Sequence, residues 1–147
     1  MVALNRLTRK KLGELLVEQG LLTEEQVQDT LRLQHQLGLL FGETLVQQKL
    51  ITEEKMVAVL VAQFGIPYIL PSQYSINREL LDIFDPAMMR RFQFVPMDSI
   101  GSVLVVAIGG LLTEDLLREI EGQTGCTLQL FLTKMSEINT VLQANGL

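Results

Sequence analysis

The sequence is poor in the residues that most often build disulfide, metal and catalytic sites. It has one cysteine, one histidine and no tryptophan among its 147 residues. A single cysteine cannot form an internal disulfide or a cysteine-based metal site, and such sparse use of cysteine is typical of a reducing compartment. We therefore expect a cytoplasmic protein.

A surplus of positive charge and a long apolar run are also missing. The formal net charge is −5 and the sequence pI is about 4.9, which disfavours nonspecific binding to nucleic acid because neutralising phosphates needs clustered Lys and Arg. Apolar runs such as SVLVVAI are far shorter than the roughly 20 residues of a membrane-spanning helix. We expect no nucleic-acid partner and no direct membrane insertion, so any location at the inner face of the membrane would depend on a partner protein.

The signatures of common enzyme sites are absent as well. The sequence contains no G-x-x-x-x-G-K-[ST], no H-E-x-x-H and no G-x-S-x-G motif. The run VVAIGG places two glycines after a strand pattern, but it lacks the third glycine and the parallel unit of a dinucleotide-binding turn, which favours a plain tight turn. We expect no enzymatic activity, no metal and no cofactor.

Three isolated features each have a structural and a functional interpretation. His35 fits the end of a helix or a ligand, and Cys126 fits a small buried residue or a reactive thiol. A basic cluster near the start fits a solvated face, or it neutralises a phosphate beside a short helix. Its members are Arg6, Arg9, Lys10 and Lys11.

The most informative feature that is present is an internal repeat. The stretch LGELLVEQGLLTEE, from Leu12, nearly recurs 29 positions later as FGETLVQQKLITEE, from Phe41. Between residues 12–34 and 41–63, 11 of the 23 aligned residues are identical. Each copy predicts a short helix and then a second helix with a threonine N-cap. The fourth helix is apolar almost all round and should be buried, whereas the second is amphipathic and should be peripheral.

The two copies differ at the residue that ends the first helix. Gly20 suits the left-handed conformation that commonly follows a helix, but Lys49 takes this position in the second copy. A lysine in that conformation costs about 1 kcal/mol. The second turn should therefore close differently or carry mild strain.

The pattern changes from Gly65 onward. Two prolines predict an extended connector, followed by a helix near residues 77–84 and another in PAMMRRF. The remainder predicts the order β-β-α-β-α, beginning with a hairpin whose turn lies at residues 99–101.

These patterns define an expected fold and its division. The fold class is α+β: a tandem helix-turn-helix repeat of four short helices, then a small three-stranded sheet with two covering helices. We expect a repeat subdomain at residues 1–64, a connector with short helices at 65–92, and a small α/β subdomain at 93–147.

Several motifs together resemble a known family. They are the repeated LGxxLVxxG, the paired Gln34 and Gln63, and the runs FGIPYI, RRFQFVPM and VLVVAI. In this order, over nearly the whole chain, they resemble the N-terminal domain of type II secretion and type IV pilus assembly ATPases, a superfamily that includes the MshEN cyclic di-GMP-binding domains. The resemblance implies a region that precedes the motor and, in secretion ATPases, docks on an inner-membrane partner. The chain is then either the N-terminal part of such a motor or a standalone relative.

The MshEN members also imply a ligand site. Their tandem motif binds cyclic di-GMP, whose pseudo-two-fold symmetry suits a repeat. The binding positions implied here are Lys11, Leu12, Gly13, Leu16, Val17, Gln34, Phe41, Gly42, Leu45, Val46 and Gln63. Lys11 and Leu40 stand where the binding pattern has arginine, and loss of a stacking or bidentate arginine costs about 1 to 3 kcal/mol.

Two functions follow from the resemblance. The first is a non-catalytic regulatory or protein-docking module that links the motor to its inner-membrane assembly partner. The alternative is a cyclic di-GMP sensor domain that controls such a motor, which the retained glycines and glutamines favour. The expected partners are the ATPase motor domain or the inner-membrane assembly protein, and cyclic di-GMP is the one ligand suggested.

Overall fold

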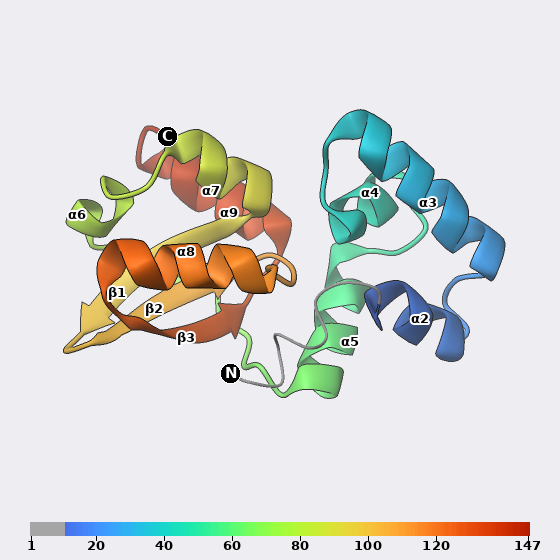
Figure 1. The fold of residues 1–147 in the computed structure, drawn as a ribbon, viewed down its shortest axis with the longest axis horizontal. Coiled ribbons are helices and arrows are strands. Elements are labelled where there is room, and N and C mark those ends of the chain that lie inside the picture. Colours follow the sequence, from blue (N-terminus) through green and yellow to red (C-terminus); the bar gives the residue numbers. More distant parts are fainter. Residues whose placement is uncertain (1–10) are drawn as a thin grey trace.

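The computed structural model describes residues 11–147, with Lys11 as backbone alone, and arranges them in two lobes (Figure 1). The repeat lobe contains α2 to α5, and the sheet lobe contains the three strands with η1 and α6 to α9. Arg6, Arg9 and Lys10 of the basic cluster lie outside the described residues. The subdomain bounds given above remain a prediction.

The repeat lobe consists of the four predicted helices. They are α2 (Lys11–Glu18), α3 (Glu24–Leu37), α4 (Phe41–Gln47) and α5 (Glu53–Phe64). Thr23 and Thr52 cap α3 and α5 as predicted, each accepting a hydrogen bond from the backbone three residues later. Helix α5 buries Met56, Val57, Val59 and Leu60, whereas α3 buries Val27 and Thr30. The central place of α5 and the peripheral place of α3 are therefore confirmed.

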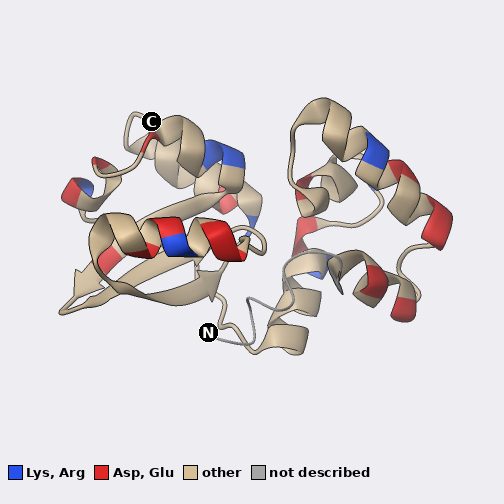
Figure 2. Cartoon of the chain, in the orientation of Figure 1, with Lys and Arg blue, Asp and Glu red and all other residues tan. Residues whose placement is uncertain are grey.

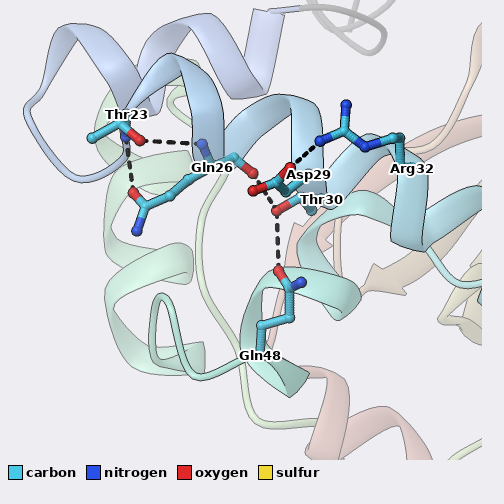
Figure 3. A network of polar contacts seen from close by, with 6 residues as sticks. All are labelled: Thr23, Gln26, Asp29, Thr30, Arg32 and Gln48. Atoms are coloured by element: carbon cyan, nitrogen blue, oxygen red, sulfur yellow. Dashed lines mark hydrogen bonds and ion pairs between the residues drawn. The ribbon is translucent and has the colours of Figure 1, made fainter.

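Polar contacts hold α3 at both its start and its middle (Figure 3). The Thr23 backbone donates to Gln26 Oε1 at 2.9 Å, and the Gln26 backbone donates to Thr23 Oγ1 at 3.1 Å, which forms a capping box. The fully buried Thr30 hydroxyl lies 2.7 Å from Gln26 O and 3.1 Å from Gln48 Oε1. This hydroxyl ties α3 of the first copy to the turn after α4 of the second.

The turns that end α2 and α4 close in the same way. Gly20 has φ +73° and Lys49 has φ +60°. Their backbone amides donate to Val17 O and Val46 O, both at 3.0 Å, as in a Schellman cap. Of the two outcomes expected for Lys49, the structure has the strained left-handed one.

The sheet lobe begins with short helical elements. They are η1 (Pro71–Gln73), α6 (Arg78–Leu81) and α7 (Pro86–Phe92). Helix α6 is shorter than the predicted 77–84, because Ile83 and Phe84 already make turn-type bonds to residues three earlier, and the residue before Pro86 avoids helical backbone.

The rest of the sheet lobe follows the predicted order. The elements are β1 (Phe94–Ile100), β2 (Val103–Ile108), α8 (Glu114–Thr124), β3 (Thr127–Leu132) and α9 (Met135–Ala144). Strand β1 pairs antiparallel with β2, and β2 pairs parallel with β3 through α8. The hairpin turn lies later than predicted, since Ser99 and Ile100 still pair with Leu104 and Val103.

Helices cover the sheet and complete its core. Helix α8 lies in front of the sheet in Figure 1, whereas α7 and α9 pack together and contact β1. Phe94, fully buried in β1, meets the Phe84 ring edge-on with 5.5 Å between ring centroids. The α+β fold class, with a four-helix repeat and a three-stranded sheet, is confirmed.

A side chain from the repeat lobe caps a helix of the sheet lobe. Lys134, the N-cap residue of α9, makes no side-chain capping bond. The Glu53 carboxylate accepts instead from Ser136 N and Ser136 Oγ, each at 2.8 Å. Because the first amides of a helix have no partner within it, this carboxylate supplies a missing cap. Lys134 also approaches Glu54 at 3.7 Å, so we call these contacts the interlobe clasp.

Candidate functional site

A pocket of about 770 Å³ lies where the two lobes meet. All four helices of the repeat lobe contribute to it, together with the β2–α8 loop and the start of α9. We call it the interlobe pocket. Its lining residues are Leu12, Gly13, Glu14, Glu24, Val27, Gln28, Leu31, Gln34, Leu40, Phe41, Gly42, Glu43, Met56, Leu60, Gly109, Gly110, Leu111, Thr113 and Met135.

The two copies of the repeat bring equivalent positions to this one pocket. Five pairs of lining residues are separated by the repeat spacing of 29 positions. These pairs are Leu12 with Phe41, Gly13 with Gly42, Glu14 with Glu43, Val27 with Met56, and Leu31 with Leu60. The repeated segments therefore line one shared space.

The paired glycines allow the two helices of each copy to pack closely. A β-carbon on Gly13 would lie 3.1 Å from Val27 Cγ1, and one on Gly42 would lie 2.7 Å from Met56 Sδ. Val27 and Met56 are themselves equivalent residues. Helix packing accounts for both glycines, so their retention in the sequence is not evidence of a ligand.

The sheet lobe closes the pocket with a glycine turn. Gly109 and Gly110 follow β2, and Thr113 then caps α8. A β-carbon on Gly109 would lie 2.9 Å from Met135 Cγ and 3.3 Å from Gln93 Cβ. The close approach of α9 therefore accounts for Gly109, whereas a β-carbon on Gly110 would have no neighbour within 4 Å.

The charged residues that line the pocket are acidic. Glu14, Glu24 and Glu43 line it, and within residues 12–147 it is lined by no lysine or arginine. Figure 2 shows the acidic residues on α2 and on the first turn of α3. Burial raises the pKa of the Glu43 carboxyl, while a hydrogen bond from Leu40 N to its Oε1, at 3.2 Å, opposes that rise. Around these carboxylates the walls are mainly aliphatic and aromatic.

The residues implied by the resemblance fall into two groups. Leu12, Gly13, Gln34, Phe41 and Gly42 line the pocket. Six others do not appear in the lining. Leu16 and Leu45 are fully buried in the core, and Val17 and Val46 are half-buried against it. Gln63 is exposed at the end of α5, and the Lys11 side chain lies outside the described residues.

Sequence reasoning missed the acidic residues of the pocket. Glu14 and Glu43 are identical at equivalent positions of the repeat, which was the available signal. The resemblance pointed to the glycines and apolar residues of the repeated motif and not to these two glutamates. The contributions of Gly109 and Met135 had no local signal, because only the folded chain brings them to the repeat.

The other isolated candidates have ordinary surroundings. His35 is exposed in the last turn of α3, and the half-buried Cys126 thiol lies 3.5 Å from Thr124 O. Within the described part of the chain no group of three His, Cys, Asp or Glu residues could hold a metal ion. Among the helices described, none is both long and apolar enough to cross a membrane.

The chain is an α+β domain in which a duplicated helix pair and a small mixed sheet enclose one pocket. Comparison with known proteins gives its family. The MshEN domain family matches residues 64–146, more than half of the chain, and the chain belongs to this family. The matched range holds the end of α5 and the sheet lobe rather than the repeat. No curated protein matches the chain.

Two solved proteins share the whole architecture. The structure of MshE with cdg has 21% sequence identity and a TM-score of 0.67, with 93% of this chain and 99% of that chain covered. The N-terminal domain of XpsE has 18% identity and a TM-score of 0.63, with 90% and 93% covered. In a second crystal form of the XpsE domain the TM-score is 0.66, with 88% and 90% covered. At this level of identity the likeness establishes the fold.

Proposed function

We propose that the chain is a non-catalytic regulatory and protein-docking module of the secretion and pilus assembly ATPase kind, linking a motor to its inner-membrane assembly partner. The observation that carries this proposal is the chemistry of the interlobe pocket. Its walls are mainly apolar, and the charged residues that line it within residues 12–147, Glu14, Glu24 and Glu43, are acidic. Apolar surface that remains open in a folded domain is typical of a site for another molecule.

The acidic lining favours a protein partner over a dinucleotide with two phosphates. Each phosphate would approach carboxylates of like charge, which costs free energy in a partly desolvated pocket. Leu40, which stands where the binding pattern has arginine, lines the pocket as an apolar residue. The substitution removes a phosphate or guanine contact and adds to the surface that a protein segment can cover.

The docking proposal is tested by pairwise binding. The full chain would be titrated against the purified motor domain, and against the cytoplasmic region of the inner-membrane assembly protein, from the same organism. We expect saturable binding to one of them in calorimetry. Failure of both to bind under native conditions would contradict the proposal.

A cyclic di-GMP sensor is the second candidate, because five equivalent residue pairs of the repeat line one pocket and such pairing suits a ligand with pseudo-two-fold symmetry. The similar MshE structure contains cdg, which is cyclic di-GMP, and this also supports the candidate. Titration with cyclic di-GMP is expected to give no heat of binding at ligand concentrations below about 100 μM, so any binding would be weak. Tight binding that is lost in Gln34→Ala would reverse the order of the two candidates, and Lys11→Arg with Leu40→Arg would test whether restored arginines recover a lost site.

A further inference from the structure

Two of the carboxylates that line the interlobe pocket, Glu24 and Glu43, are available to a binding partner. Neither Glu24 nor Glu43 forms an ion pair with a lysine or arginine within residues 12–147. Glu53, the equivalent of Glu24 in the second copy, is instead used by the interlobe clasp. Within residues 12–147, Glu24 and Glu43 are therefore not neutralised by a basic side chain.

Glu43 is the most desolvated of these groups. Burial raises the pKa of its carboxyl, so its charged form lacks part of the solvation it would have in water. Its described hydrogen bond, from Leu40 N at 3.2 Å, uses Oε1 alone. A cation that enters the pocket would restore favourable charge interactions to a carboxylate that folding has already partly desolvated, so the desolvation cost of the pair falls mainly on the cation.

The apolar surface around these groups continues out of the pocket. Leu31 lines the pocket and is nevertheless 44% exposed on α3. Met56 lines the pocket from the repeat lobe, and Met135 lines it from the sheet lobe. Methionine side chains are unbranched and adaptable, so they suit contact with varied apolar groups. Such a surface fits a protein segment that packs apolar side chains beside one charged group.

We propose that the interlobe pocket receives a segment of the docking partner that presents a lysine or arginine side chain between apolar side chains, with Glu24 and Glu43 as its charge partners. This inference deepens the proposed docking function and rests on it. The stated chemistry follows from charge complementarity: Glu24 and Glu43 lie in a mainly apolar lining, and the described lining residues include no cation. A metal ion is a poor alternative, since the described residues hold no group of three metal ligands.

The test uses the full chain labelled with [methyl-13C]methionine and two short amphipathic helical peptides as probes. The peptides are identical except that one carries a central arginine and the other carries citrulline, its neutral isostere. We expect the arginine peptide to shift the methyl signals of Met56 and Met135, which line the pocket, and to leave those of Met89 and Met97, which do not line it, unchanged. Its affinity should exceed that of the citrulline peptide by about tenfold, the factor that corresponds to about 1.4 kcal/mol, and should fall as salt is added.

Charge-removing variants then locate the contact. In the double variant Glu24→Gln and Glu43→Gln, affinity for the arginine peptide should fall about tenfold, whereas Glu119→Gln, on the exposed side of α8, should leave it unchanged. The inference would be overturned by any of three results. The two peptides could bind equally well, the double variant could bind the arginine peptide as the wild type does, or the methyl shifts could be confined to Met89 and Met97. So would tighter binding of cyclic di-GMP by the double variant together with shifts of Met56 and Met135.

The failure of this inference can be separated from failure of the docking function. If the motor domain or assembly protein binds the wild type and the double variant equally well, docking stands and the proposed cation site is wrong. If neither protein binds but the two peptides differ as expected, the cation site stands and the docking function is wrong.

Discussion

The first copy of the repeat, α2 with α3, and the second, α4 with α5, have the same local structure but face different neighbours. Both pack their helices through a glycine, at Gly13 and Gly42, and both end the first helix with a left-handed residue. Helix α5 buries Met56, Val57, Val59 and Leu60, whereas the longer α3 buries only Val27 and Thr30. Duplication has thus preserved a folding unit whose surfaces then acquired different uses.

The difference is clearest at identical residues. Glu24 lines the interlobe pocket, while its equivalent Glu53 caps α9 across the lobe boundary. Gln34 lines the pocket, while its equivalent Gln63 is exposed. Identity between copies therefore indicates a shared role only where the surroundings are also shared, as they are for the glycines.

The largest expected effect tests what the copies share. Leu16 and Leu45 are equivalent and fully buried, so Leu16→Ala and Leu45→Ala should each lower the free energy of unfolding by about 2 to 5 kcal/mol. Chemical denaturation followed by circular dichroism measures this loss, with Leu37→Ala, which truncates a side chain that is 48% exposed, as the control. A cost well below 1 kcal/mol at either leucine would show that the two cores are not equivalent.

The next effect separates the two copies. Glu53→Ala removes both bonds to Ser136, whereas Glu24→Ala makes the same change at the same helix position without a clasp. The first variant should be less stable than the second by about 1 to 2 kcal/mol, the usual cost of losing a helix cap. Thermal and chemical unfolding would compare them. Equal stability of the two variants would mean that the interlobe clasp adds nothing in solution.

Much of this contrast could be predicted from sequence, because it depends on local pattern. Helical periodicity, the caps at Thr23 and Thr52, and the apolar surface of α5 predicted the four helices and their burial. The alignment of Lys49 with Gly20 left two alternatives for this turn, a different closure or mild strain, and the structure has the strained one. The pocket could be predicted only in part, since Gly109 and Met135 reach it through tertiary packing, and since a fold-determining glycine has the same sequence signal as a ligand-binding one.

Exchanging the residues that end α2 and α4 gives a smaller effect. Lys49→Gly relieves the left-handed strain and should stabilise the chain by about 0.5 to 1 kcal/mol, while Gly20→Lys should destabilise it by about 1 kcal/mol. Opposite signs in chemical denaturation would confirm that both turns require the same backbone. If Lys49→Gly is neutral or destabilising, the lysine side chain contributes contacts that offset its strain.

The smallest effect concerns Glu43, whose pKa burial raises above its ordinary value of 4.5. Because the folded state then holds the proton more tightly than the unfolded state, acidification through the raised pKa toward 4.5 stabilises the wild type. At neutral pH the carboxylate is charged in both states, and its partial burial subtracts from stability.

Glu43→Gln, whose amide oxygen can still accept from Leu40 N, should therefore be slightly more stable than the wild type at pH 7, and this advantage should shrink as the pH falls toward 4.5. Thermal unfolding at several pH values measures the difference; a constant or growing advantage at low pH would contradict the assignment. Glu43→Gln is also one of the two changes in the double variant that should bind the arginine peptide more weakly. If Glu43→Gln alone gains stability and loses part of this binding, Glu43 serves the pocket rather than the fold.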